Sequence, residues 1–346
     1  MLHDISNVPS NLKTYGGLAC TKIGVTLDGI DYLVKYPTST KAKNFKNTSL
    51  LYLNNSVSEY LGSKIFKLFG LPVHNVSLVF RNEKLCALCE DFVKSGRLVE
   101  FRELKSTYEP GFINPDGNMS DGSGTDLEET LLVIRNHPIL RKLEDYEDYF
   151  WKIFIIDALI GNHDRNNGNY GIIIDGTCVN KAPVYDNGNC LNPSWSDSKM
   201  QYYLDDIQKM FDVAYKVNTC RFTLNGKPIN PFHLISSGKY KNCTEALRII
   251  DNVSVTDIVG ILNSCTVLNE TQKRFFTVLL RFRLQHLKEI LMSLTSCNFS
   301  EYYITKVKAT LDKYDTDLML SDVLVRLPSV ELDDDMLVEV IQFMVR

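Results

Sequence analysis

One stretch constrains this chain more than any other: an apolar segment that runs directly into a loop rich in asparagine and glycine. Residues 151–160 have the composition of a buried helix, and the polar loop continues to residue 171. Asp164 stands in this loop and Asn169 follows five positions later. Two short apolar runs then lead to Asp186. The pattern predicts that a helix, a loop and a hairpin bring two carboxylates and one amide together.

This order of side chains is the arrangement that protein kinases use for phosphoryl transfer. In that chemistry one carboxylate, here Asp164, orients the attacking hydroxyl and accepts its proton. An amide and a further carboxylate, here Asn169 and Asp186, hold the Mg²⁺ ions that bridge the phosphates of ATP. The alternative is a polar surface loop that contains two aspartates by chance, because Asn and Asp are common in loops.

A glycine pair near the start of the chain fits the same interpretation. Gly16 and Gly17 free the backbone to approach a phosphate, and Lys22 adds positive charge. An alternating run follows, and Asp28-Gly29 predicts a tight hairpin turn. The returning strand carries Lys35, where kinases place a lysine that contacts ATP. The alternative is that Lys35 is an ordinary solvent-exposed lysine of this strand.

Residues 49–70 form a helical pattern whose core-facing stripe has steps of four, four and three: Val57, Leu61, Ile65 and Leu68. Glu59 lies off that stripe, and it is the only acid between Lys35 and Glu83. A kinase needs a helix here whose glutamate pairs with the lysine. Glu59 is therefore the candidate, and an exposed glutamate on an amphipathic helix is the alternative.

Two further β-runs, 71–79 and 84–89, close a small β-rich unit. We expect residues 89–93 to be the hinge that receives adenine, with Glu90 and Phe92 as nucleotide contacts. The expected fold is α+β and two-lobed like a protein kinase, with a small β-rich N-lobe (1–93) and a larger, mainly helical C-lobe (94–346).

The remainder of the chain is predicted to be mostly helical. A surface loop covers 108–126, and Thr125 with Glu128 suggests a capping box before the next helix. After Asp186 the polar segment 187–202 is predicted to be irregular. Further helical patterns occupy 146–160, 204–215, 244–252, 271–294, 302–314 and 332–344.

Composition places few limits on partners. The net charge is −4, so the sequence carries no strong nucleic-acid signal. It has no apolar run of about 18 residues, and its first residues lack the features of a signal peptide. The nine cysteines are odd in number and scattered, as expected for reduced thiols. We expect a cytoplasmic protein, or one secreted without a signal peptide, with no membrane span. Cys86 and Cys89 form the only CxxC pair, which alternation in a β-run explains better than metal binding.

As a set, these motifs resemble the HipA-like serine/threonine kinases, and a short bacterial branch of them in particular. The resemblance rests on Tyr15-Gly-Gly with Lys22, on 32–37, 58–60 and 157–169, and on Tyr185-Asp-Asn-Gly188, and it covers nearly the whole chain in motif order. Two departures concern the catalytic loop: Asn166 replaces the histidine that usually follows Asp-Arg, and His163 precedes Asp164 instead. The glycine loop also departs, with Leu-Ala-Cys-Thr at 18–21. HipA toxins carry an extra subdomain before the glycine loop, which we expect to be absent here.

The resemblance implies an ATP- and Mg²⁺-dependent kinase whose substrate is a protein, including the kinase itself. Asp164 would be the base, Asn169 and Asp186 the Mg²⁺ ligands, and Lys35, supported by Glu59, the phosphate contact. Residues 16–22 would form the phosphate loop. A separate regulatory or antitoxin-like protein is a further implied partner.

HipA-like kinases also modify a serine near the glycine loop, so we expect autophosphorylation there. The nearby hydroxyls are Ser10, Thr14, Tyr15 and Thr21, and the alternative acceptors are Ser120, Ser123, Thr125, Ser194, Ser196 and Ser198. Two rival functions stay open: a lipid or small-molecule kinase of phosphoinositide-kinase type, and a catalytically weak kinase fold that acts as a binding module.

Overall fold

The computed structural model describes residues 2–16, 21–41, 50–108, 121–296, 301–314, 316, 318–320, 323–324, 327 and 333–345. The N-terminal part is an antiparallel sheet of four strands in the order β1-β2-β4-β3, formed by Lys22–Leu27, Ile30–Lys35, Lys84–Glu90 and Val76–Arg81 respectively. The predicted turn between β1 and β2 is confirmed, because Asp28 and Gly29 both have positive φ (50° and 76°). Register pairs Lys22 with Lys35, which places both lysines at the same end of the hairpin.

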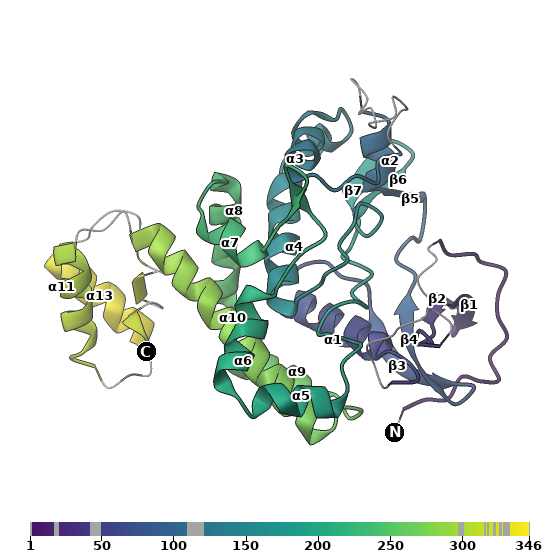
Figure 1. Ribbon diagram of the computed structural model, residues 1–346. Helices are drawn as coiled ribbons and strands as arrows, with labels where there is room; N and C mark the ends of the chain where they lie inside the picture. Colours follow the sequence, from purple (N-terminus) through teal and green to yellow (C-terminus); the bar gives the residue numbers. More distant parts are fainter. Residues whose placement is uncertain are drawn as a thin grey trace.

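Helix α1 (Asn55–Leu68) packs on this sheet (Figure 1). The expected start near residue 49 was wrong for the residues that are described, because 50–54 are not helical. The backbone groups of Leu51 and Leu53 form hydrogen bonds with residues 38–40 instead, so they have partners without being part of a helix. Gly70 ends the helix with φ 78°. The predicted stripe is buried except for the half-buried Leu68.

The chain after α1 connects the sheet to the rest of the molecule. We predicted a strand from residue 71, but β3 begins at Val76. Residues 72–74 pair in parallel with the segment before Asp186: the Val184 N–H donates to Pro72 O (2.8 Å), and the His74 N–H donates to Val184 O (3.2 Å). This pairing joins two segments that lie about a hundred positions apart.

A second sheet, of order β5-β6-β7, comprises Arg97–Glu100, Gly171–Asp175 and Cys178–Lys181. Its β6–β7 turn contains Gly176 at φ 58°. Near it lie α2 (Phe101–Ser106), α3 (Leu127–Asn136), η1 (Leu140–Lys142) and α4 (Tyr146–Ile160). The capping-box prediction was wrong in detail: Asp126 caps α3, and Thr125 donates to Arg221 O.

Helix α4 is buried along most of its length and forms the centre of the main hydrophobic core. An all-round apolar helix of this kind is expected inside a large helical unit. Around it and the long α10 (Glu270–Ser296) lie α7 (Pro231–Ser236), α8 (Lys241–Ala246), η3 (Leu247–Asn252) and α9 (Val255–Ser264). A small hairpin, β8 (Thr223–Leu224) with β9 (Lys227–Pro228), completes this part.

The region after Asp186 is more ordered than predicted. A helix, α5 (Asp197–Leu204), occupies part of the segment that we expected to be irregular. The single helix predicted over 204–215 is divided into α6 (Ile207–Phe211) and a π-turn, η2 (Asp212–Lys216). The helix begins at Ile207 and not at 204 because of Asp206, whose backbone is extended and whose carboxylate caps α6 by accepting from Gln208 and Lys209 N–H.

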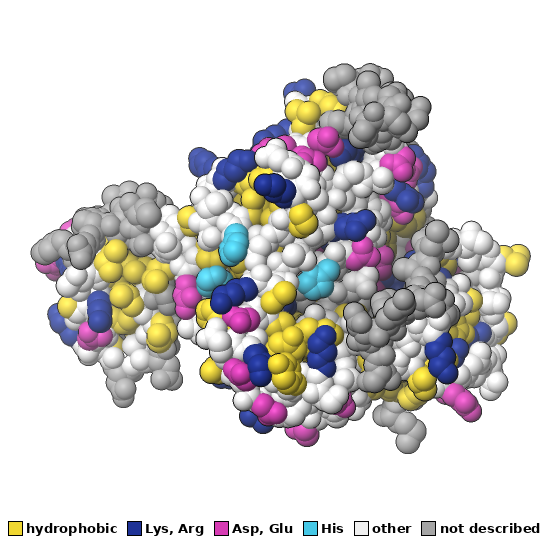
Figure 2. All heavy atoms as spheres, viewed as in Figure 1, with side chains coloured by type: hydrophobic (Ala, Val, Ile, Leu, Met, Phe, Trp, Pro, Cys, Tyr) yellow, Lys and Arg dark blue, Asp and Glu magenta, His cyan; other side chains and the backbone are white. Residues whose placement is uncertain are grey.

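The C-terminal helices α11 (Glu301–Leu311) and α13 (Asp334–Val345) have a small core of their own, separate from the main one. The last helix was predicted over 332–344, and residue 332 lies outside the described part. These helices lie at the left of Figure 1, and hydrophobic side chains are visible on their surface in Figure 2. None of the described helices has both the length and the apolar character needed to cross a membrane.

Candidate active site

The loop predicted to be catalytic begins where α4 ends. Gly161 caps the helix in the left-handed conformation (φ 63°), which turns the chain sharply away from the helix axis. The Asn169 side chain then folds back, and its Nδ2 donates to Asp164 O (2.7 Å). The Asp164 carboxylate accepts from Asn189 Nδ2 at Oδ2 (2.9 Å) and from Asn166 Nδ2 at Oδ1 (3.3 Å). The structure therefore brings Asp164 and Asn169 together, and it adds Asn189, which sequence reasoning did not identify.

Arg165 holds this loop in place from the buried side. It is 2% exposed and forms a two-pronged ion pair with Asp157 of α4 (Nε–Oδ2 2.8 Å, Nη2–Oδ1 3.0 Å). It also donates to Asn169 O (3.0 Å) and to Asn187 Oδ1 (2.7 Å). Burial raises the pKa of Asp157, although the charge of Arg165 opposes that rise. The signal for this ion pair was an aspartate inside an apolar helix, because buried carboxylates are almost always paired.

Lys35, Glu59 and Asp186 form a second charged cluster. Lys35 Nζ lies 2.8 Å from Glu59 Oε2 and 2.9 Å from Asp186 Oδ1. Glu59 is 1% exposed, so the alternative of a surface glutamate was wrong. Burial alone would raise the pKa of Glu59, but the charge of Lys35 and a hydrogen bond from His74 outweigh it and hold that pKa well below its ordinary value.

The position of Asp186 depends on its neighbours. Its φ of 59° lies in the left-handed region, which Asp adopts more readily than most residues. Burial raises the pKa of Asp186, but the charge and hydrogen bond of Lys35, together with the charge of Lys22, outweigh burial and lower that pKa. The next residue, Asn187, donates its N–H to Glu59 Oε1 (3.1 Å). Glu59 thus contacts both the lysine and the backbone that carries Asp186.

His74 was not identified from the sequence, yet it lies in the same cluster, with Nε2 3.0 Å from Glu59 Oε1. The ligand atoms of Glu59, His74 and Cys89 lie within 4.8 Å of one another, a grouping that could hold a metal ion. However, both oxygens of Glu59 are already bonded, Oε1 to His74 and the Asn187 N–H and Oε2 to Lys35, which argues against a metal ion there. Cys86 and Cys89 are both buried in β4, so this CxxC pair lies within a strand.

The segment expected to be the hinge has most of its backbone N–H groups engaged. Glu90 N–H donates to Asn75 O, Asp91 N–H to Asp31 O, and Val93 N–H to the Asp91 carboxylate. Among the described residues, Phe92 N–H has no acceptor. The Glu90 side chain binds Asn75 and Lys94, while the Phe92 ring packs 5.5 Å from that of Tyr185.

The expected phosphate loop is described only at its two ends. Lys22 Nζ donates to Gly16 O (2.9 Å), so both ends lie close together. Gly17 and residues 18–20 lie outside the described part of the chain. Just before the loop, Lys13 and the Tyr15 hydroxyl both bind the buried Asp91 carboxylate (2.6 and 3.0 Å). Burial and this hydrogen bond raise the pKa of Tyr15 above its ordinary value.

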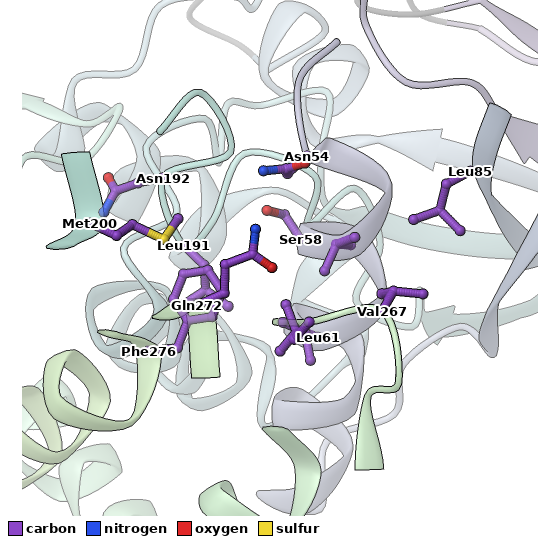
Figure 3. Close-up of a pocket in the computed structure, with 12 residues that line it drawn as sticks. Asn54, Ser58, Leu61, Leu85, Leu191, Asn192, Met200, Val267, Gln272 and Phe276 are labelled. Atoms are coloured by element: carbon purple, nitrogen blue, oxygen red, sulfur yellow. The ribbon is translucent and has the colours of Figure 1, made fainter. Parts of the chain in front are cut away.

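A small cavity of ≈ 90 Å³ lies on the face of α1 turned away from Glu59. Figure 3 shows the side chains of Asn54, Ser58 and Gln272 converging on it above apolar walls that include Leu61 and Phe276. Its described lining contains no charged side chain.

Known proteins are similar to this chain in sequence and in fold. No protein-family model matches the chain. It is 29% identical over 273 residues to the serine/threonine-protein kinase CtkA of Helicobacter pylori, an alignment that covers 78% of this chain and 80% of that protein.

The crystal structure of H. pylori CtkA, described as a proinflammatory kinase, matches with a TM-score of 0.76 at 26% identity, covering 87% of this chain and all of that one. A complex of HipA, HipB and operator DNA from Shewanella oneidensis matches with a TM-score of 0.47 at 12% identity, over 81% of this chain and 67% of that one. The implied antitoxin-like partner stays a prediction. The chain is a homologue of the serine/threonine-protein kinase CtkA and has its kinase-like α+β fold.

Proposed function

We propose that this chain transfers the γ-phosphate of Mg-ATP to a serine or threonine hydroxyl of a protein, using Asp164 as the base. The observation that carries the proposal is the buried cluster in which Lys35 contacts both Glu59 and Asp186. Charged groups are rarely buried unless they serve each other or a ligand. Homology to a serine/threonine kinase supports the same activity and favours it over a lipid kinase.

Asp164 would orient the attacking hydroxyl and accept its proton. Its carboxylate is half-buried and held by two amide donors, Asn166 and Asn189. Asn189 is exposed, so an incoming hydroxyl can replace it at Oδ2 without disturbing the core. A carboxylate held at a fixed position contributes by orienting its substrate, which is a large part of phosphoryl-transfer catalysis.

Asn169 and Asp186 fit a Mg²⁺ site. The side-chain nitrogen of Asn169 donates to Asp164 O, and its side-chain oxygen, Oδ1, has no donor among the described residues and can act as a ligand. Asp186 is about one-third exposed (34%) and offers carboxylate oxygens, the hard donors that Mg²⁺ prefers. Bound Mg²⁺ neutralises charge on the phosphates during transfer. Lys35, held by Glu59, would bind the ATP phosphates in addition to the Mg²⁺.

For the nucleotide base, we assign the hinge to residues 89–93, between an N-lobe (1–93) and a C-lobe (94–346). Phe92 N–H is the donor that would meet adenine, because the N–H groups of Glu90, Asp91 and Val93 are already bonded. The Glu90 side chain is bonded to neighbours, so its contribution would come from its backbone. Gly16, Gly17 and Lys22 would cover the phosphates.

Autophosphorylation near the phosphate loop is part of the proposal. Thr14 and Thr21 are exposed on either side of the loop, whereas the Tyr15 hydroxyl is bonded to Asp91. A phosphate adds about −1.5 to −2 charges at neutral pH. Beside Lys22 it would compete with ATP for the same positive charge. Among the alternative acceptors, Ser198 is exposed and shares a hydrogen bond with Ser196; Ser120 lies outside the described residues.

The deciding experiment measures the transfer of labelled phosphate from ATP, in the presence of Mg²⁺, to the protein itself and to a generic protein substrate. Asp164→Asn should reduce transfer by orders of magnitude while the protein stays folded by circular dichroism. Asp148→Asn, which changes a surface acid of α4 paired with Lys152, is the matched control and should keep full activity. A folded Asp164→Asn protein with undiminished transfer would show that Asp164 is not the base.

Peptide mapping of the labelled wild-type protein tests the acceptor separately. Phosphate at Thr14 or Thr21, together with weaker ATP binding by the phosphorylated form, is the expected result. Phosphate found only beyond residue 100 would contradict self-inhibition at the loop and leave the kinase assignment intact.

A further inference from the structure

His74 lies in the connection between α1 and β3, where none of the catalytic motifs predicts a functional residue. It is 5% exposed. Its backbone N–H donates to Val184 O, two positions before Asp186, and its side chain contacts Glu59. One residue therefore touches both the segment that leads to Asp186 and the acid that holds Lys35.

The direction of the side-chain hydrogen bond follows from charge. The pKa of Glu59 is held well below its ordinary value, so Glu59 is a carboxylate and can only accept. His74 Nε2 must then carry the proton and donate. Oε2 of Glu59 binds Lys35, while Oε1 binds both His74 and the Asn187 N–H.

The imidazole is fixed on its other side by an aromatic ring. The Phe92 ring meets it edge to face, with centroids 6.4 Å apart and planes at 79°. Phe92 in turn packs against Tyr185, which precedes Asp186. The imidazole thus has little freedom to leave Glu59.

Core contacts of α1, made by Leu61 and Ile65 among others, fix the helix itself but not the orientation of the Glu59 carboxylate. The face of the helix turned away from Glu59 borders the cavity of Figure 3, whose walls include Val57, Ser58 and Leu61. Lys35 is attracted to both Glu59 and Asp186, so it does not by itself fix Glu59 in one orientation. The bonds to Oε1 supply the missing restraint.

We propose that His74 is a positioning residue of the kinase site, which holds the Glu59 carboxylate in the orientation that presents Lys35 to the ATP phosphates. This inference rests on the proposed roles of Lys35 and Glu59. His74 itself touches neither ATP nor the reacting hydroxyl; it acts through Glu59.

The test uses the full chain with two substitutions of His74 and one of Glu59. His74→Leu keeps bulk but removes the donor, and it should lower kcat/KM for ATP about 10- to 100-fold, mainly through KM, as expected for a lost hydrogen bond to a charged group. His74→Gln restores a donor and should recover most of that loss. His137→Leu is the control, because His137 is equally buried (5%) but, among the described residues, its side chain bonds to the nearby Ile139 N–H and lies outside the cluster.

The decisive measurement is the combination of His74→Leu with Glu59→Gln. If His74 acts through the carboxylate, the double variant should be no worse than Glu59→Gln alone within about twofold. Fully additive losses, or a His74→Gln variant as poor as His74→Leu, would overturn the role of His74 alone. A folded Glu59→Gln protein with wild-type activity would instead refute the proposed role of the Lys35–Glu59 pair, and the His74 inference with it.

Discussion

Replacing Arg165 with methionine should destabilise the protein more than almost any other single change in the site. The guanidinium is buried, and it satisfies groups in α4, in the catalytic loop and in the segment after Asp186. Methionine fills a similar volume but donates nothing. The carboxylate of Asp157 is then left buried, with Asn162 Nδ2 (3.0 Å) as its remaining side-chain donor among the described residues.

The size of the effect follows from these contacts. Breaking a buried ion pair by removing one partner costs about 3–5 kcal/mol, because a charge stays uncompensated. The acceptors at Asn169 O, Tyr185 O and Asn187 Oδ1 also lose their donor. These costs overlap, so we expect about 5 kcal/mol in the free energy of unfolding. Total stabilities are typically about 5–15 kcal/mol, so the variant should be barely folded at 25 °C.

Urea unfolding followed by fluorescence of Trp151 and Trp195 measures this loss. Arg135→Met is the matched control: Arg135 forms an ion pair with Glu147 at 2.6 Å but is half exposed, so its loss should cost about 0–1 kcal/mol. Adding Asp157→Leu to Arg165→Met removes the stranded charge and should recover about 2 kcal/mol. A loss below about 1 kcal/mol for Arg165→Met, or strictly additive effects in the double variant, would refute the reasoning.

Three further predictions concern the metal, the packing and the pH. Asp186→Asn should abolish turnover at ordinary Mg²⁺ concentrations without unfolding the protein, because a neutral amide binds Mg²⁺ poorly; normal activity across a Mg²⁺ titration would exclude Asp186 as a ligand. Gly62→Ala should raise KM for ATP and cost about 1–3 kcal/mol, since its Cβ would lie 2.8 Å from Asn187 Cβ. The control Gly260→Ala, where no atom lies within 4 Å of the new Cβ, should be neutral or stabilising in the same unfolding assay. Burial lowers the pKa of His163 below its ordinary 6.5, so the unfolded state binds the proton more readily and stability falls as pH drops through that value. His163→Asn should therefore flatten the pH dependence of the unfolding midpoint between about pH 7 and 5.5, and an unchanged slope would contradict this origin.

The local sequence was sufficient to predict several elements of this protein. Asp28-Gly29 predicted its hairpin because the left-handed conformations that such a turn requires suit these two residues. Gly70 predicted the end of α1 for the same reason. The spacing of Asp164, Asn169 and Asp186 identified the candidate site, because protein kinases carry the groups for phosphoryl transfer in that order along the chain.

Other features depended on partners far away in the sequence. Residues 50–54 were predicted to be helical but bond to 38–40, and no local signal reveals that competing backbone partner. The helical stripe correctly indicated which residues face the core. Glu59 lies off that stripe and is nevertheless buried, because Lys35 and His74 make its burial favourable. A periodic pattern describes one face of a helix and does not include what packs on the others.

His74, Asn187 and Asn189 show the same limit within the site. Asn187 was part of a recognised motif and Asn189 lies just after it, but their contacts to Glu59 and Asp164 cross 128 and 25 positions of sequence. His74 stands in a connection with no motif at all. Side-chain type and spacing determined which chemistry this chain can perform. Only the tertiary structure decided which groups hold the catalytic ones in place, because hydrogen bonds and ion pairs form between whichever side chains the completed fold brings within about 3 Å.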